Sequence, residues 1–315
     1  MTALYIFLGV IGFLLMITLI IAYITYRIAF HSPDKTQNDI HFIPPDGQIN
    51  DRREKMIEMI DALDAIPYEK VETTSFDGLT LAARYIHVKD GAPCAICCHG
   101  YRGTSIRDFC GGGKIPLAMS HNILLIDQRG CRESEGHAIT FGIKERYDVF
   151  SWITYLLERF GNQLKIELFG VSMGAATVLL ASGMGLPKNV THIIADSPYT
   201  SPKEIITKVC SVDMHIPAWL GMPFLSLGAR LFAGIHINDG DVIEAVKRSP
   251  VRILLVHGES DHFVPLDMSR RIAASAPDTV TLHTYPNASH ALSYIADRER
   301  YEKMATDYLS KDQYL

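Results

Sequence analysis

The first apolar stretch of the chain runs from Ala3 to Tyr26 without a charged residue. About 20 apolar residues in a helix cross the hydrocarbon core of a bilayer, so this length predicts one membrane span. Tyrosines lie near both ends of the stretch, where the boundary between lipid and water favours them. We therefore expect residues 1–30 to form a transmembrane anchor.

A cleaved signal peptide is the alternative interpretation of this stretch. No Lys or Arg precedes it, and no site of the A-x-A type follows it, so a retained span is favoured. Arg27 and Lys35 follow the span, whereas only the amino terminus precedes it. The positive-inside rule then predicts a single-pass protein of the cell membrane with its large C-terminal part in the cytoplasm.

Two short segments connect this span to the rest of the chain. Residues 31–49 are polar and contain several prolines, which is typical of a linker. Residues 50–67 carry apolar side chains at helical spacing and end at Pro67, so we expect an amphipathic helix that packs on the following domain. Its charges are mixed rather than basic, which disfavours the alternative of a helix on the membrane surface.

Residues 68–315 alternate between patterns of strands and helices. A hairpin signal at Asp77-Gly78 joins the first two strands. The predicted strands are residues 71–76, 79–87, 93–98, 122–127, 165–169, 191–196, 252–257 and 279–285, and the predicted helices are residues 115–120, 144–160, 172–182, 242–247, 266–276 and 295–310. This order predicts an α/β domain in which helices flank a mostly parallel central sheet. In such a domain, reactive groups gather at the carboxyl ends of the strands.

Composition narrows the function classes. The formal net charge of −5 includes no basic run, which argues against nucleic acid as a partner. The six cysteines include three within one apolar run, Cys94, Cys97 and Cys98, and we interpret all six as reduced, buried residues of a reducing compartment. No spacing of Cys or His matches a zinc site, so we expect neither a metal nor another cofactor.

The strongest chemical signal is the sequence Gly170-Val171-Ser172-Met173-Gly174. An apolar strand pattern ends there and a helical pattern of small residues begins. A serine in so tight a turn needs neighbours with almost no side chain, which the two glycines supply. The turn would expose the serine hydroxyl, and the following helix would favour a developing oxyanion. We expect Ser172 to be a nucleophile.

Two other loops follow predicted strands. The loop His99-Gly100-Tyr101-Arg102-Gly103 can offer an unobstructed backbone N–H to an oxyanion, although a plain glycine turn would have the same composition. The loop that begins at Asp127 and contains Arg129 is charged, and we interpret both residues as structural partners in ion pairs rather than catalysts.

A serine nucleophile needs a base and an acid to orient that base. The loop after residues 252–257 offers Asp261 as the acid, with Glu259 and Asp196 as rivals. The last strand is followed by His290, which comes after the serine and the acid in the chain order expected for this architecture. His257 is a second candidate base, but it lies inside a predicted strand and is better explained as a core residue.

These motifs resemble the α/β-hydrolase superfamily over about residue 68 to the C-terminus. They are His99-Gly100, Asp127-x-Arg129-Gly130, Gly170-x-Ser172-x-Gly174, Gly258-x-x-Asp261-x-x-Val264-Pro265 and Ser289-His290. The chain looks most similar to the serine aminopeptidase-like, monoglyceride-lipase-like and cinnamoyl-esterase-like branch. The resemblance implies Ser172 as nucleophile, Asp261 as acid and His290 as base, with oxyanion N–H groups from Tyr101 and Met173. One departure is Arg132, which stands where the family often has a second glycine.

An insertion, Ser197 to Gly240, occupies the place of a lid in this superfamily. It is rich in large apolar residues, which have two interpretations. The lid can bury its own apolar face on the core, or it can line a pocket for an apolar acyl or aryl group. Pro217, Pro223 and Arg230 interrupt the run, so a second membrane span is not expected.

Together these features predict a membrane-anchored serine hydrolase that cleaves small-molecule or lipid-like carboxylic esters through an acyl-enzyme. A peptidase or amidase with the same triad is one alternative, although the lid offers few acids to bind a substrate amino group. A catalytically silent binding protein on the same fold is the other, because a fold does not determine a function.

Overall fold

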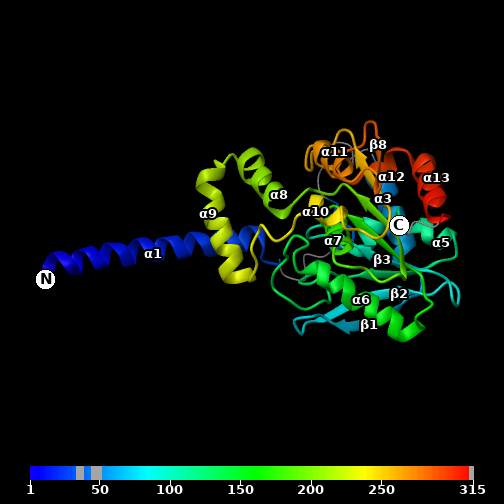
Figure 1. Ribbon diagram of the computed structural model, residues 1–315, viewed down its shortest axis with the longest axis horizontal. Helices are drawn as coiled ribbons and strands as arrows, with labels where there is room; N and C mark the ends of the chain where they lie inside the picture. The colour runs from blue at the N-terminus through cyan, green and yellow to red at the C-terminus, as the bar shows by residue number, and fades with distance from the viewer. Residues whose placement is uncertain (33–38, 44–51, 312–315) are drawn as a thin grey trace.

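The computed structural model describes residues 1–32, 39–43 and 52–311, so most of the predicted linker, residues 31–49, and the start of the predicted helix at residue 50 lie outside the described residues. Residues 68–311 are built around one eight-stranded sheet with the strand order β1-β2-β4-β3-β5-β6-β7-β8 (Figure 1). The strands are β1 (Glu69–Thr74), β2 (Thr80–Ile86), β3 (Cys94–Cys98), β4 (Asn122–Ile126), β5 (Ile166–Val171), β6 (Val190–Asp196), β7 (Ile253–Gly258) and β8 (Val280–Tyr285).

Only β2 runs antiparallel to its neighbours β1 and β4, and the remaining pairs are parallel. Every residue of β3 and β4 is buried, because a parallel sheet in an α/β protein is covered on both faces. The predicted α/β class, with a mostly parallel sheet flanked by helices, is confirmed.

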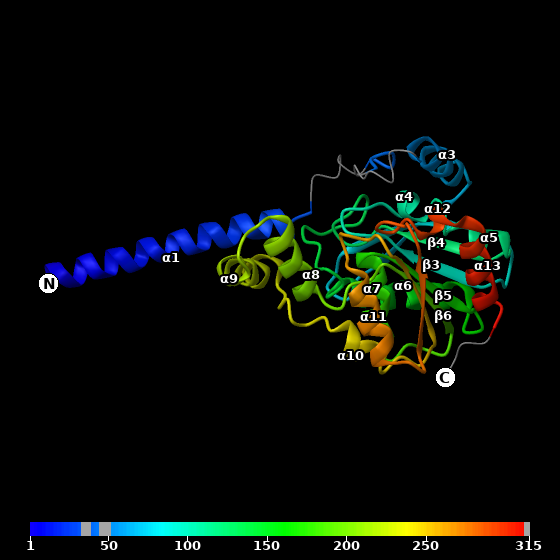
Figure 2. The same cartoon turned by 90° about the horizontal axis from the view of Figure 1, so that it is seen from above.

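Helices cover each face of the sheet and form two separate apolar cores (Figure 2). One core includes side chains from α6 (Glu145–Phe160), α7 (Met173–Ser182), α10 (Val242–Val246) and α11 (Leu266–Ser275). The other includes side chains from α3 (Arg53–Asp64), α4 (Ser105–Phe109), α5 (Lys114–Ala118), α12 (Ser293–Ala296) and α13 (Arg298–Leu309). Helix α3 buries Met56, Met59, Ile60 and Leu63, the apolar face that its sequence pattern contains.

The N-terminal helix α1 (Thr2–Ala29) projects from the α/β domain that contains the sheet (Figure 1). It is long and apolar enough to cross a membrane, and a signal sequence satisfies the same criteria. Only its last turns enter the protein, where Ala22 and Tyr26 are buried. The following Phe30 is also fully buried. The end of α1 is therefore part of the apolar core that includes α6 and α7.

The insertion at residues 197–240, which the sequence predicts to be a lid and which keeps that name below, contains α8 (Pro202–Lys208), α9 (Ala218–Gly228) and two short π-helical segments, Val209–Asp213 and Ala229–Ala233. Both views show α9 beside the C-terminal part of α1 (Figures 1 and 2). The Thr25 hydroxyl donates a hydrogen bond of 3.1 Å to the Phe224 carbonyl. A Cβ at Gly228 would collide with the Ala22 carbonyl, so glycine permits the two helices to approach closely.

Candidate active site

Ser172 lies in a sharp turn between β5 and α7. Its φ of 55° and ψ of −115° are strained for a residue with a side chain, as a nucleophile elbow requires. A Cβ at Gly174 would collide with the Cys98 carbonyl, and one at Gly170 would collide with Gly174. Side chains at positions 170 and 174 would therefore not fit, as the sequence predicted for so tight a turn. The turn leaves Ser172 at the carboxyl end of β5.

The structure brings Ser172, His290 and Asp261 together from three strand ends. His290 Nε2 lies 2.8 Å from Ser172 Oγ, and His290 Nδ1 lies 2.7 Å from Asp261 Oδ2. Because a carboxylate only accepts, Nδ1 carries the proton and Nε2 is free to accept the serine proton. This arrangement has the geometry of a nucleophile, a base and an orienting acid.

Asp261 is held by its backbone surroundings as well as by His290. Its Oδ1 accepts hydrogen bonds from the N–H groups of Phe263 and Val264 at 2.9 and 2.8 Å. Burial opposes ionisation, but the hydrogen bonds from His257 and His290 outweigh it and hold the pKa of Asp261 well below its usual range. The Asp261 carboxyl is therefore ionised at neutral pH.

The two rival carboxylates bind other groups. Glu259 accepts a hydrogen bond from the Thr284 hydroxyl at 2.7 Å. Asp196 accepts hydrogen bonds from Ser197 at 2.9 Å and from Tyr301 at 3.3 Å. Asp261 is thus the carboxylate that the described residues place on His290.

His257 is the residue near the site whose role the sequence did not predict. It is fully buried in β7, as expected of a core residue. Its Nε2 lies 2.9 Å from the Val264 carbonyl and 3.2 Å from Asp261 Oδ2. Since a carbonyl only accepts, Nε2 carries a proton, which also faces the acid. Ser269 contacts the other ring nitrogen at 2.7 Å, so His257 is fixed below Asp261.

The loop after β3 lies against Ser172. A Cβ at Gly100 would lie 3.4 Å from Ser172 Cβ, and the Gly100 N–H donates to Asp108 Oδ2 at 2.7 Å. Tyr101 is the next residue, and its hydroxyl donates to the Ala29 carbonyl at 2.9 Å. Met173 is the first residue of α7. Tyr101 follows Gly100, which packs against Ser172, and Met173 follows Ser172 directly. Both residues predicted to supply oxyanion N–H groups are therefore next in sequence to this contact.

The loop after β4 is fixed by buried polar groups. Arg129 donates to Asp148 at 2.7 Å and to Asp77 at 2.9 Å, so it is a structural ion-pair partner, as its position in the sequence indicated. Asp127 lies 3.6 Å from Arg132 Nε. Arg132 itself has a φ of 45°, a left-handed conformation that glycine adopts without strain. This explains why a glycine is common at that position in the family loop.

A cavity of about 380 Å³ opens at Ser172 and His290. Its apolar wall comes from the segments at Ile43, α3 and α12, with side chains that include Met56, Met59, Leu292 and Ile295. No residue of the lid, 197–240, lines this cavity. The interpretation of the lid as the wall of an acyl pocket is therefore wrong for this cavity, because the lid packs on α1 and the core instead.

Two polar groups of this cavity neutralise each other. Arg107 Nε donates to Asp108 Oδ1 at 2.8 Å, and another nitrogen of Arg107 donates to the Phe42 carbonyl at 3.0 Å. Burial opposes ionisation of Asp108, but the charge of Arg107 helps to lower its pKa. The cavity is therefore apolar with one internally matched ion pair. All six cysteines are buried and form no disulfide, and one of them, Cys110, lines this cavity.

Comparisons with known proteins agree with this fold. The family model described as "alpha/beta hydrolase fold" matches residues 96–238. The uncharacterised protein YqkD of Bacillus subtilis is 23% identical over 247 residues, which cover 77% of this chain and 81% of the relative. The uncharacterised protein YfhR of Escherichia coli K12 is 26% identical over 249 residues, 76% of this chain and 80% of the relative.

Solved structures show the same fold. An esterase of Pyrococcus furiosus superposes with a TM-score of 0.64 at 21% identity, covering 80% of this chain and 94% of the esterase. An acylaminoacyl peptidase of Pyrococcus horikoshii superposes with a TM-score of 0.58 at 15% identity, covering 79% of this chain and 42% of the peptidase. The chain has the α/β-hydrolase fold, and the solved structures that share this fold include esterases and a peptidase.

Proposed function

We propose that this protein is a membrane-anchored serine hydrolase that cleaves carboxylic esters with an apolar acyl or aryl group. The observation that supports the proposal most directly is the continuous hydrogen-bond chain from Ser172 through His290 to Asp261. Ser172 and His290 border an apolar cavity rather than a charged surface, which favours a substrate with an apolar group.

In the proposed reaction, His290 Nε2 takes the proton of Ser172 as Oγ attacks the ester carbonyl. Asp261 keeps the imidazole oriented and stabilises its positive charge. The backbone N–H groups of Tyr101 and Met173 bind the oxyanion, and the dipole of α7 adds to this stabilisation. His290 then protonates the leaving alcohol, and water releases the acyl group by the same steps in reverse order.

A peptidase or amidase remains the second candidate, favoured by the likeness of the fold to an acylaminoacyl peptidase. A substrate amino group would need a carboxylate in the cavity. Asp108 is already bound by Arg107 and by the Gly100 N–H, so the cavity has no acid prepared for that role among the described residues. Ester hydrolysis is therefore the better supported chemistry. The aligned Ser172–His290–Asp261 contacts also argue against a catalytically silent binding protein.

Labelling with a fluorophosphonate tests the proposal. We expect the wild type to be labelled and Ser172→Ala to lose the label, because the probe reacts with an activated serine. The matched control is Ser182→Ala, which removes a buried hydroxyl at the other end of α7 and should leave labelling intact. A panel of esters and matched amides would then separate an esterase from an amidase. A folded wild type that resists the probe would overturn the hydrolase proposal.

Substitution of the cavity wall tests the substrate class. Met56→Trp adds bulk to the wall formed by α3 and should shift the preferred ester to a shorter acyl group, with a loss of about tenfold or more in kcat/KM for long chains. Leu220→Trp makes the same change on the exposed lid and should leave the preference unchanged. The reverse result would assign the acyl site to the lid.

A further inference from the structure

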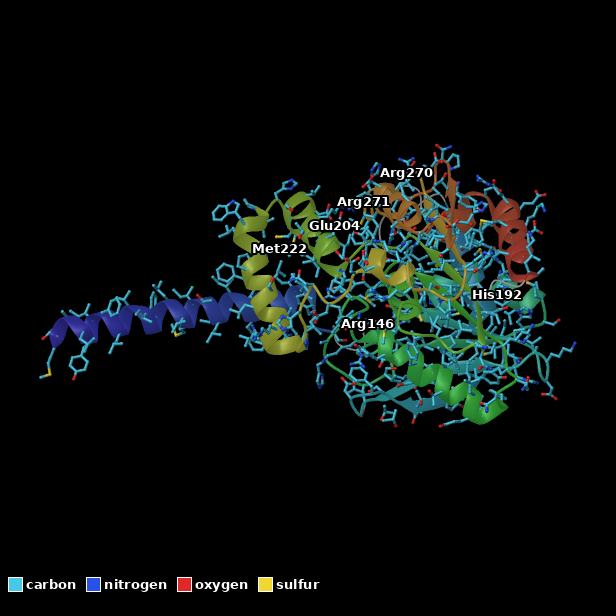
Figure 3. The ribbon with its side chains drawn as sticks, in the orientation of Figure 1. Arg146, His192, Glu204, Met222, Arg270 and Arg271 are labelled. Carbon is cyan, nitrogen blue, oxygen red and sulfur yellow. The ribbon has the colours of Figure 1, made fainter. Side chains whose placement is uncertain are left out.

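The lid carries a set of large apolar side chains that face solvent. Trp219 is 78% exposed, and it is accompanied by the exposed residues Val212, Met214, Leu220, Leu231 and Phe232. We call these six residues the lid patch. Figure 3 shows side chains projecting from α9 on the side away from the α/β domain. So many exposed apolar side chains on one short segment are typical of a surface that contacts another apolar phase.

The lid patch is continuous with the apolar surface of α1. The Phe232 ring lies 5.2 Å from the Tyr23 ring in an edge arrangement and 5.5 Å from the Tyr26 ring. The close approach of Gly228 to the Ala22 carbonyl and the hydrogen bond between Thr25 and the Phe224 carbonyl fix α9 to the same part of α1. The orientation of the lid patch is therefore tied to that of α1.

The position of these contacts along α1 determines how deep they would lie in a membrane that α1 crosses. A helix rises about 1.5 Å per residue, so about 20 residues cross a hydrocarbon core of about 30 Å. Arg27 is the first charged residue of α1 and lies about one turn beyond Ala22, against which Gly228 of α9 packs. The lid then lies at the boundary between acyl chains and headgroups, the depth that Trp and Tyr prefer.

We propose that the lid patch lies in the membrane interface beside α1 and forms a second, non-spanning contact with the lipid surface. The proposal rests on α1 being a retained membrane anchor. With 11 residues, α9 is too short to span a bilayer, but an apolar face can lie about 5–10 Å deep in the interface. The exposed Arg230 precedes Leu231 of the patch in sequence, and the exposed Arg27 follows Tyr26, whose ring lies against Phe232. Both cations suit anionic headgroups.

The chain contains a convenient reporter of this contact, because it has only two tryptophans. Trp219 is in the lid patch, whereas Trp152 is fully buried in α6. The Trp152 indole N–H has no hydrogen-bond partner among the described residues, so Trp152→Phe loses no hydrogen bond and leaves Trp219 as the reporter. Trp219→Phe is the matched control and leaves Trp152.

The full chain would be reconstituted into phosphatidylcholine vesicles with bromine atoms near either the headgroup end or the methyl end of the acyl chains. In Trp152→Phe, we expect Trp219 to lose about half of its emission to bromines near the headgroup end and less to bromines near the methyl end, as an interfacial depth requires. In Trp219→Phe, the emission of Trp152 should be unaffected by either lipid.

Two results would overturn the proposal. Trp219 that is quenched by aqueous iodide but not by brominated lipid would place the lid patch in water. Trp219 that resists both quenchers, together with cross-linking between chains through the lid, would assign the patch to a second copy of the protein. Release of the full chain from vesicles by alkaline carbonate would show that α1 is not a membrane anchor, and this proposal would then fail with it. Fluorophosphonate labelling at Ser172 would still test the hydrolase proposal separately.

Discussion

Asp261 is the residue on which the most contacts of the site converge. Its two oxygens receive two backbone N–H groups and lie within hydrogen-bond distance of two histidines, His257 and His290. One oxygen is used by the backbone and the other by the imidazoles, so the carboxylate has little freedom to rotate. The imidazole of His290 is therefore oriented by a group that is itself fixed, which is the arrangement that holds a catalytic geometry.

Asp261→Asn tests this role. An amide in place of the carboxylate favours the wrong tautomer of His290 and leaves its positive charge unstabilised, so kcat for an ester should fall by about 10⁴ with little change in KM. Glu259→Gln is the matched control, because Glu259 binds Thr284 instead of the histidine. An equal loss of kcat in the control, or a loss below about tenfold in Asp261→Asn, would contradict the assignment.

The residues of the site differ in how far the sequence could predict them. Ser172, Asp261 and His290 follow strands with clear apolar patterns, so their convergence follows from the geometry of a parallel sheet. His257 looks like any core residue from its position in a strand. Its contact with Asp261 depends on how the loop after β7 turns back, and no periodic pattern records that turn.

At the scale of elements, the loop after β3 is connected to the end of α1. Arg102 donates to the Ile28 and His31 carbonyls at 2.9 and 3.1 Å, and Tyr101 donates to Ala29. A cation on the last carbonyls of a helix is favoured by the helix dipole. The position of the proposed oxyanion donor Tyr101 therefore depends on where α1 ends.

Arg102→Ala should lower kcat about tenfold while KM stays nearly constant, because a small displacement of the oxyanion loop weakens binding of the transition state more than binding of the ester. Arg102→Lys should recover part of the loss. The control is Arg146→Ala, which removes a comparable hydrogen bond of 2.9 Å from α6 to the Asp239 carbonyl. A rise in KM without a change in kcat would indicate a role in substrate binding instead.

The apolar periodicity was sufficient to predict the eight strands and the order of the longer helices, but the partners of several helices did not follow from it. The pattern of α3 predicted a buried face and did not indicate that Met56 and Met59 of this face also border the cavity at Ser172. The apolar residues of the lid were evident, but an apolar run does not specify which surface it covers. Here that surface includes α1, which is distant in sequence.

For the whole molecule, the site lies at the carboxyl ends of β5, β7 and β8, and buried charges near it influence stability. Asp196 ends β6, and its carbonyl accepts the Ser172 N–H at 2.8 Å. Burial raises the pKa of the Asp196 carboxyl to about 6, and hydrogen bonds from Ser197 and Tyr301 offset only part of this effect. The folded protein therefore retains a proton there that the unfolded chain releases near its ordinary pKa of about 4.

This difference predicts how stability depends on pH. Between about pH 4 and about pH 6 the folded state binds more protons at Asp196 than the unfolded state, so its contribution to the free energy of unfolding decreases as pH rises through this window. Asp196→Asn keeps an acceptor for Ser197 and Tyr301 and removes the titration. The variant should match the wild type near pH 4 and exceed its free energy of unfolding by about 2–3 kcal/mol near pH 7.

Urea unfolding of the full chain in detergent micelles across this pH range would measure the difference. Asp278→Asn is the control, because that carboxyl is exposed in a turn, and its curve should run parallel to that of the wild type. If the free energy of unfolding of Asp196→Asn changes with pH in parallel with that of the wild type, Asp196 is ionised in the folded protein throughout this pH range. In that case the charge beside the Ser172 backbone would be stabilised by its hydrogen bonds to Ser197 and Tyr301.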